Sequence, residues 1–284
     1  MGNNASSDSD INRKPDNPQE TLNMSNYYYS GFFAGEMTCS IIKATNRNPK
    51  GHFYMVDFTV SNADKKLLEH INHRVMGNIG VISPIKGAFN LKVRGKNRVR
   101  KVLKFLQVYS IIVGDLAKNR IDILSEALEY LDTHRGHHAH EEKTELMDSL
   151  RHKLRLIKTE GMTENTYELD SKIPKEAIGY FLAGIIDGEG SFGIKQSGKY
   201  KEPFFSIAMK DRKIIELMCN FLEHGKVRYR KDGVYHYEVN SRKELLKIAN
   251  IFLVEYPLQQ KRQRDRLVKL QRILNDYTRN HSRK

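Results

Sequence analysis

The sequence predicts an α+β fold in which two pseudo-symmetric αββαββα repeats pack on each other through one helix from each repeat. Three observations predict this fold. A glycine-containing segment occurs twice, each copy is followed by the same succession of apolar patterns, and corresponding positions keep a nearly constant spacing along the chain.

The repeated segment is the strongest of these signals. Its first copy, residues 29–41, reads YSGFFAGEMTCSI, and its second copy, residues 182–194, reads LAGIIDGEGSFGI. Gly31 corresponds to Gly184, which sets an offset of 153 residues (184 minus 31). Both copies precede a polar–apolar alternation and have an apolar stretch of helical length, so each is predicted to be a helix that leads into a strand.

The elements that follow also match between the halves. Residues 38–61 and 191–210 predict a first hairpin in each half, and residues 80–94 and 226–240 predict a second. Between the two hairpins lies a helix in each half. The apolar stripes of these helices are Leu67, Leu68, Ile71 and Val75, and Ile214, Ile215, Met218 and Leu222. A further helix runs into Tyr109 or Tyr256, and the offset of 147 there (256 minus 109) predicts that the first hairpin is six residues longer in the first half.

Four segments follow from this pattern. Residues 1–24 are predicted to be a disordered tail, because they are rich in Asn, Ser, Asp and Pro. Residues 25–132 form the first repeat, 133–174 a linker that contains a helix, and 175–284 the second repeat with a basic C-terminal helix over 259–280. The predicted packing positions of that last helix are Leu267, Leu270 and Ile273. The linker histidines are interpreted as a solvated loop, with a metal site as the alternative: His134, His137, His138 and His140.

Composition narrows the function classes. A net charge of +14 and a pI near 9.6 indicate a polyanionic partner, either nucleic acid or an anionic membrane surface. The basic residues are not gathered into one amphipathic segment, which disfavours the membrane surface. The two cysteines, Cys39 and Cys219, lack zinc-finger spacing and favour a reducing compartment. No apolar run is long enough to predict a transmembrane helix.

The glycines and acids of the repeated segment suggest chemistry. Gly31 and Gly35 lie on one face of the first predicted helix, as Gly184 and Gly188 do on the second, and small residues at this spacing allow two helices to pack closely. We therefore expect the two copies to pack on each other and to bring Glu36 and Glu189 together. Two adjacent carboxylates favour a hard divalent cation between them, and such a site facing a phosphate backbone hydrolyses phosphodiesters.

Residues 182–192, LAGIIDGEGSF, resemble the signature of the LAGLIDADG homing endonucleases. The first copy departs from that signature, because Ala34, Met37 and Cys39 stand where the second copy has Asp187, Gly190 and Phe192. Its place in the repeat nevertheless supports the same interpretation. The resemblance extends over roughly residues 27–278.

The resemblance implies a single-chain DNA endonuclease whose sheets form a saddle along the major groove. It implies that Glu36 and Glu189 bind Mg²⁺ or Mn²⁺, assisted by Ala34, Gly35 and Gly188, whereas Ca²⁺ binds without supporting cleavage. It also suggests a basic residue in each half, Lys261 in the second and Lys118 in the first. The implied partner is a duplex of about 20 base pairs bound by a monomer. Members of the family are common in organelle introns, so a mitochondrial or chloroplast setting is compatible with the resemblance.

Polar residues of the hairpins are the candidate DNA contacts, because such side chains can pair with base edges or phosphates. They are Ser40, Lys43, Thr45, Arg47, Lys50, Lys92, Arg94, Lys195, Gln196, Lys199, Lys201, Arg228, Arg230 and His236. A register shift of one residue would reverse the face on which each lies, so about half are expected to be solvated side chains without a DNA contact. Two alternatives to the endonuclease are an intron RNA maturase and a DNA-binding protein without cleavage activity.

Overall fold

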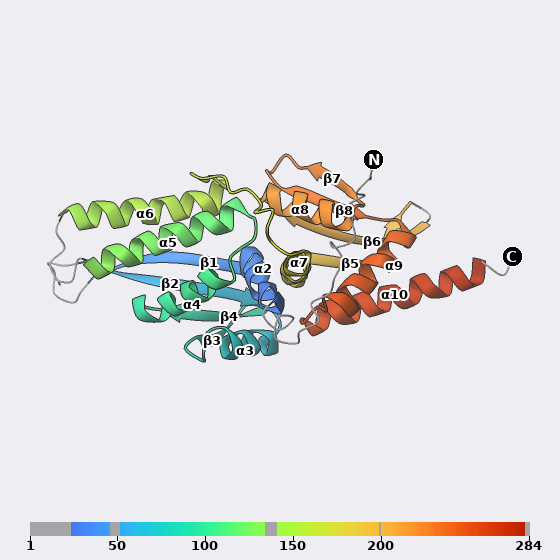
Figure 1. Ribbon diagram of the computed structural model, residues 1–284, viewed down its shortest axis with the longest axis horizontal. Helices are drawn as coiled ribbons and strands as arrows, with labels where there is room; N and C mark the ends of the chain where they lie inside the picture. The colour runs from blue at the N-terminus through green and yellow to red at the C-terminus, as the bar shows by residue number, and fades with distance from the viewer. Residues whose placement is uncertain (1–23, 46–51, 134–140, 199, 282–284) are drawn as a thin grey trace, which may run out of the picture.

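The computed structural model describes residues 24–45, 52–133, 141–198 and 200–281, and it contains two repeats joined by a helical linker (Figure 1). The first repeat comprises α2 (Tyr27–Glu36), β1 (Met37–Thr45), β2 (His52–Asn62), α3 (Lys65–Arg74), β3 (Val81–Ile85), β4 (Ala88–Arg94), α4 (Lys96–Val108) and α5 (Asp115–Thr133). The linker contributes α6 (Glu141–Glu160). The second repeat comprises α7 (Lys175–Glu189), β5 (Gly190–Ser197), β6 (Tyr200–Met209), α8 (Arg212–Leu222), β7 (Lys226–Tyr229), β8 (Tyr235–Val239), α9 (Arg242–Asn250), the π-helical turn η1 (Ile251–Glu255) and α10 (Lys261–His281).

The two antiparallel sheets have the same topology, with strand orders β1-β2-β4-β3 and β5-β6-β8-β7. Met37 pairs with Val60, 23 residues away, whereas the corresponding Gly190 pairs with Ile207, 17 residues away. The first hairpin is therefore six residues longer, as the change in offset predicts. The predicted α+β fold of two pseudo-symmetric repeats is confirmed.

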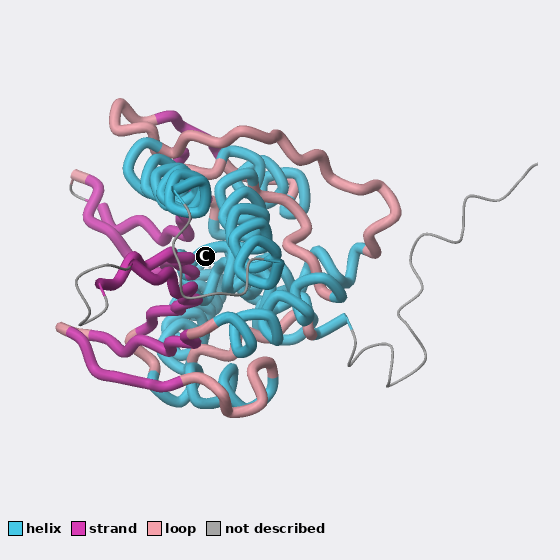
Figure 2. Tube along the Cα trace, turned by 90° about the vertical axis from the view of Figure 1, so that its left-hand side faces the viewer, coloured by secondary structure: helices cyan, strands magenta, loops and turns pink. Residues whose placement is uncertain are grey.

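Each sheet has one covered face and one open face. The tube view shows the strands gathered on one side of the molecule and the helices on the other (Figure 2). Alternation along β1 follows this division, because Met37, Cys39 and Ile41 are buried against helices whereas Thr38 and Ser40 are partly exposed on the opposite face. The same two-residue period assigns every strand residue to the helix-covered or the open face.

The helices that cover the sheets are amphipathic, as their apolar stripes predict. Leu67, Leu68 and Ile71 of α3 are buried, and the side chain of Asp64 caps this helix by accepting a hydrogen bond from the Leu67 amide at 3.2 Å. In α8 the matching stripe, which includes Ile214, is buried as well. These contacts hold each helix against the covered face of its own sheet.

The C-terminal helix differs from expectation at one packing position. Leu267, Leu270 and Leu274 are buried, whereas Ile273 is 41% exposed. The prediction of Ile273 as a packing residue was wrong, because the helical period that continues from Leu267 and Leu270 selects position 274.

Within the described ranges, none of the helices combines the length and apolar character that a bilayer crossing requires. The predicted tail over residues 1–24 lies outside the described residues except for Met24, and the linker histidines lie outside them entirely.

Candidate active site

The site is built on the contact between α2 and α7, whose backbones touch at two glycines. A Cβ atom on Gly31 would lie 1.8 Å from the carbonyl oxygen of Phe181, and one on Gly184 would lie 2.0 Å from the carbonyl oxygen of Tyr28. Any side chain at either position would overlap the main chain of the opposite helix. The repeated glycines are therefore required by the close approach of the two helices.

The second glycine of each helix receives the glutamate of the other. A Cβ atom on Gly188 would lie 3.0 Å from Cγ of Glu36, and one on Gly35 would lie 3.2 Å from Cγ of Glu189. Each glutamate thus reaches across the helix pair, at the point where α2 leads into β1 and α7 leads into β5. The fold brings together two carboxylates that are 153 residues apart in the chain (189 minus 36).

The electrostatics of this pair oppose its double ionisation in the metal-free protein. Burial, and to a smaller extent repulsion from Glu189, raise the pKa of Glu36 to about 8, although the hydrogen bond from Asn62 acts in the opposite direction. Glu189 is the more exposed residue, yet burial of its carboxylate raises its pKa as well. A nearby cation would favour the charged form of both groups.

Glu36 is bordered by two amide side chains. The Nδ2 of Asn62 donates to Oε1 of Glu36 at 3.4 Å, and the Nε2 of Gln260 donates to Oδ1 of Asn62 at 2.7 Å. Asn62 and Gln260 are both buried, and they come from opposite repeats. Sequence reasoning missed both residues, although Gln260 stands next to the predicted Lys261.

Glu189 has different surroundings. It lines a hollow of about 240 Å³ together with three cations, Arg120, Lys158 and Lys210, and a second acid, Asp211. Arg120 donates to the carbonyl oxygen of Met37 at 3.2 Å, and Lys210 donates to that of Thr159 at 3.1 Å. The cations around Glu189 were not predicted either, because they lie on α5, on the linker and at the end of β6.

Asp187 is the acid that the first copy lacks, and it has a structural role. Its Oδ2 accepts hydrogen bonds from the Tyr28 hydroxyl at 2.6 Å and from the amides of Gln259 and Gln260 at 2.7 and 2.9 Å. Burial raises its pKa to about 6 while these hydrogen bonds oppose the shift. By holding the segment before α10, Asp187 sets the position of Gln260 beside Asn62.

The two predicted lysines do not contact the glutamates. The Nζ of Lys118 donates to the carbonyl oxygen of Ile112 at 3.1 Å and lies 5.1 Å from the ring centroid of Tyr167. Lys261 forms an ion pair with Asp265 and leaves 75% of its side chain exposed. In the described chain, no hydrogen bond or ion pair joins either lysine to Glu36 or Glu189.

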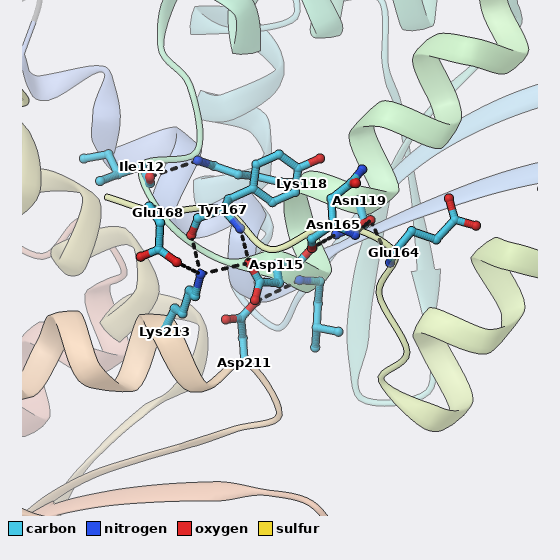
Figure 3. A network of polar contacts seen from close by, with 11 residues as sticks. Ile112, Asp115, Lys118, Asn119, Glu164, Asn165, Tyr167, Glu168, Asp211 and Lys213 are labelled. Carbon is cyan, nitrogen blue, oxygen red and sulfur yellow. Dashed lines mark hydrogen bonds and ion pairs between the residues drawn. The ribbon is translucent and has the colours of Figure 1, made fainter. Parts of the chain in front are cut away.

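Lys118 belongs instead to a network that ties the repeats to the linker (Figure 3). There the amide of Tyr167 donates to Oδ1 of Asp115 at 2.8 Å, and the amide of Leu116 donates to Oδ2 of Asp211 at 2.9 Å. The position that matches Lys261 at the 147-residue offset is Gly114, which has a φ of +132°. The first repeat therefore has no lysine at the matching place.

Strand register separates the candidate DNA contacts. The open faces carry Ser40, Lys92, Arg94, Lys195, Arg228 and His236. Two of these cations have acidic partners on the same face, since Arg94 binds Asp57 at 2.8 Å and Lys195 pairs with Glu238.

The remaining candidates lie elsewhere. Lys43, Thr45, Gln196 and Lys201 fall on the helix-covered side of their sheets, where Lys43 binds Asp148 of α6 at 2.6 Å. The two-residue period assigns these four to the face with the buried side chains, so they are the candidates that the strand register sets apart from the open faces. Arg230 lies in a turn and binds Asp232 at 2.7 Å. Arg47, Lys50 and Lys199 lie outside the described residues.

Comparison with known proteins agrees with this architecture. Residues 182–271 match the family model described as LAGLIDADG endonuclease. Among solved structures, the homing endonuclease I-GzeII in complex with its DNA target is 18% identical, with a TM-score of 0.74 over 90% of this chain and 91% of that one. A search of curated proteins finds no match.

Two further structures have the same fold. I-SmaMI, bound to uncleaved DNA with calcium ions, is 19% identical over 90% of this chain and 92% of that chain, with a TM-score of 0.74. I-LtrWI, bound to target DNA, is 20% identical over 90% and 91%, also at 0.74. The resemblance of the second repeat is thereby confirmed, and the fold comparison extends the same architecture over both repeats.

Proposed function

We propose that this chain, whose second repeat matches the LAGLIDADG endonuclease family and whose fold is that of single-chain LAGLIDADG homing endonucleases, is a site-specific DNA endonuclease. It would cut both strands of a long, asymmetric duplex. The observation that carries the proposal is the glutamate pair. The helix packing holds Glu36 and Glu189 close together although their carboxylates repel each other, and a bound divalent cation would account for this arrangement. The DNA bound by the related endonucleases supports the choice of substrate.

A divalent cation fits this donor set. Glu36 and Glu189 would hold it, with the carbonyl oxygens of Ala34, Gly35 and Gly188 as further candidate ligands, and oxygen donors suit Mg²⁺ or Mn²⁺. The described residues contain no group of three or more His, Cys, Asp or Glu side chains that could hold a metal, so phosphate oxygens of the substrate would complete the coordination. When bound, such an ion supplies an activated water and stabilises charge on the phosphate. Ca²⁺ is expected to bind without supporting cleavage.

The side chains around the pair have separate tasks in this proposal. Asn62 orients the carboxylate of Glu36, and Gln260 fixes the amide of Asn62 through its Oδ1 atom. Around Glu189, Arg120, Lys158 and Lys210 supply the positive charge that draws a phosphate into the hollow.

The open sheet faces would supply the duplex contacts. Lys92, Lys195 and Arg228 lie on these faces with Ser40, Arg94 and His236, and this mixture of donors and acceptors suits base edges and phosphates. Affinity is expected to fall steeply with salt, because phosphate contacts release counterions.

The test is selection of cleaved sequences from a randomised duplex library in Mg²⁺, with Glu36→Gln and Glu189→Gln as variants. Glu126→Gln is the matched control, because Glu126 is an exposed glutamate on α5. We expect one long site from wild type and from the control, loss of double-strand cutting in both site variants, and retained binding in Ca²⁺.

One result would reverse this assignment. If wild type cuts no duplex but binds a structured intron RNA tightly, the maturase alternative replaces the endonuclease. The departures of the first repeat at Ala34 and Gly114 are the observations that favour that alternative.

A further inference from the structure

The linker helix α6 forms one wall of a groove along the edge of the first sheet. The groove has a volume of about 490 Å³ and runs between α6, the side chain of Arg120 on α5, and β1, which is the edge strand of its sheet. Thr38 and Ser40, which belong to the open face, line it on the strand side. We call this feature the linker groove. Cys39, Ile41 and Lys43 of the covered face line it as well, so the groove follows the edge of the sheet between its two faces.

The linker groove is strongly basic. Arg151, Arg155 and Lys158 follow each other at helical spacings of four and three, so they share one face of α6, and all three are exposed. None of them forms an ion pair with an acid in the described residues. The acid that lines the groove, Asp148, is already neutralised by Lys43 at 2.6 Å.

The groove adjoins the hollow that contains Glu189. Arg120 and Lys158 line both of them. A phosphate chain that places one phosphate beside Glu189 would therefore meet these two cations next and then Arg155 and Arg151. Between residues 151 and 158 the helix rises about 10 Å. A DNA strand carries one phosphate per about 3.4 Å of helix axis, so this length matches roughly three phosphates.

We propose that the linker groove binds the sugar–phosphate backbone of the DNA strand cut at Glu189, on one flank of the cut. This inference rests on the proposed endonuclease function and adds to it a contact surface outside the two sheets. The ligand is a run of phosphates and not a set of base edges, because Arg151, Arg155 and Lys158 lie on the linker at the edge of the sheet and not on a strand face. The linker thereby contributes affinity and strand positioning without sequence discrimination.

The test compares two triple variants of the full chain with equal charge loss. Arg151→Gln/Arg155→Gln/Lys158→Gln removes the cations of the groove. Arg98→Gln/Lys101→Gln/Lys104→Gln is the control, since these exposed residues lie on α4, which packs on the covered face of the first sheet. Thermal unfolding of both variants verifies that each one is folded.

The first readout is binding to a 40-base-pair duplex of random sequence at increasing NaCl in Ca²⁺. Because each lost phosphate contact lowers the slope of log K against log salt by about 0.9, the groove variant is expected to lose about 2 to 3 from that slope. The control is expected to change it by less than 1. Equal losses in the two variants would overturn the inference, because they would reflect net charge alone.

The second readout is hydroxyl-radical footprinting on the target recovered by selection. The groove variant is expected to lose protection on one strand at one flank of the cut, while the sheet-bound positions stay protected. An unchanged footprint together with intact duplex cutting would overturn the inference and leave the endonuclease standing. Failure of wild type to bind any duplex would overturn both the groove inference and the proposed endonuclease function. If the groove variant lost binding to a structured RNA but kept duplex binding, the assignment of the groove to DNA would be overturned.

Discussion

The two glutamates occupy matching positions on matching helices, yet their surroundings differ in chemistry. Glu36 accepts from the amide of Asn62, which Gln260 holds in turn, whereas Glu189 shares its hollow with Arg120, Lys158 and Lys210. Repetition has preserved the backbone that brings the carboxylates together and has not preserved the side chains beside them. Under the proposed function, the two strands of an asymmetric target would meet different surroundings, one carboxylate being oriented by a neutral amide and the other lying near three cations.

The buried residues of the two packed helices differ between the halves as well. Tyr28 and Asp187 form a buried hydrogen bond, while the positions that correspond to them at the 153-residue offset are Phe181 and Ala34, whose side chains carry no polar atoms. The two symmetry-related combinations, each with one residue from either helix, are thus one polar and one apolar. The departure of the first copy from the signature at Ala34 is matched by Phe181 in the opposite helix, so it is a compensated difference.

The largest loss of stability is expected at the glycines of the helix contact, which both halves share. Gly184→Ala would set a methyl group 2.0 Å from a main-chain oxygen, and the helices would have to separate, at a cost of roughly 3–5 kcal/mol in unfolding free energy. Gly35→Ala, in the partner helix, meets only a flexible glutamate side chain at 3.2 Å and is expected to cost less than about 1 kcal/mol. Urea unfolding measures both, and equal losses would contradict the proposed difference between main-chain and side-chain contact.

Next in size is Asp187→Ala, which leaves the Tyr28 hydroxyl and two amides without their buried acceptor. We expect a loss of roughly 2–4 kcal/mol in unfolding free energy. The double variant Asp187→Ala/Tyr28→Phe reproduces the apolar combination found at the symmetry-related positions Ala34 and Phe181, and it is expected to recover part of that loss. If the double variant is no more stable than the single one, the hydroxyl is not the group that needs the carboxylate.

A pH-dependent stability follows from the raised pKa of Glu36, about 8 in the metal-free protein. Since the folded state holds this proton more tightly than the unfolded state, the contribution is fully favourable below about pH 4.5 and is lost as pH rises to 8. Glu36→Gln is therefore expected to exceed wild type by roughly 1–3 kcal/mol at pH 8.5 in EDTA and to match it at pH 4.

Unfolding at the two pH values measures this difference, with Glu126→Gln as the exposed control. Addition of a divalent ion should shrink the advantage of the glutamine variant at pH 8.5, because a bound cation favours the charged carboxylate. A Glu36→Gln variant with no added stability at pH 8.5 would mean that the carboxylate is well solvated.

The smallest expected effects are on cleavage rate, and they test directly whether Glu36 and Glu189 act on different strands. Asn62→Ala and Arg120→Gln are each expected to slow cleavage of one strand by about 10-fold, which corresponds to 1.4 kcal/mol, and to leave the other strand nearly unchanged. Nicking assays on a duplex labelled on each strand would measure this. Equal slowing of both strands by each variant would show that the carboxylates act as one unit and that their different surroundings have no consequence.

The sequence by itself determined the repeat, the order of helices and strands, the longer first hairpin and the pairing of Glu36 with Glu189. These features depend on local periodicity and on glycine spacing, and both can be read along the chain. Ile273 in the last helix was misplaced, and the strand faces of residues such as Lys43 stayed open, because burial depends on which side of an element meets its neighbour.

The surroundings of each glutamate were decided by the tertiary structure alone. Asn62 and Gln260 meet across 198 positions of the chain, and Arg120 reaches Met37 across 83. No spacing rule links residues so far apart, because their contact depends on how the two repeats and the linker close around the helix pair. The same closure carries Lys118 into a structural network and brings Lys158 of the linker to the hollow beside Glu189.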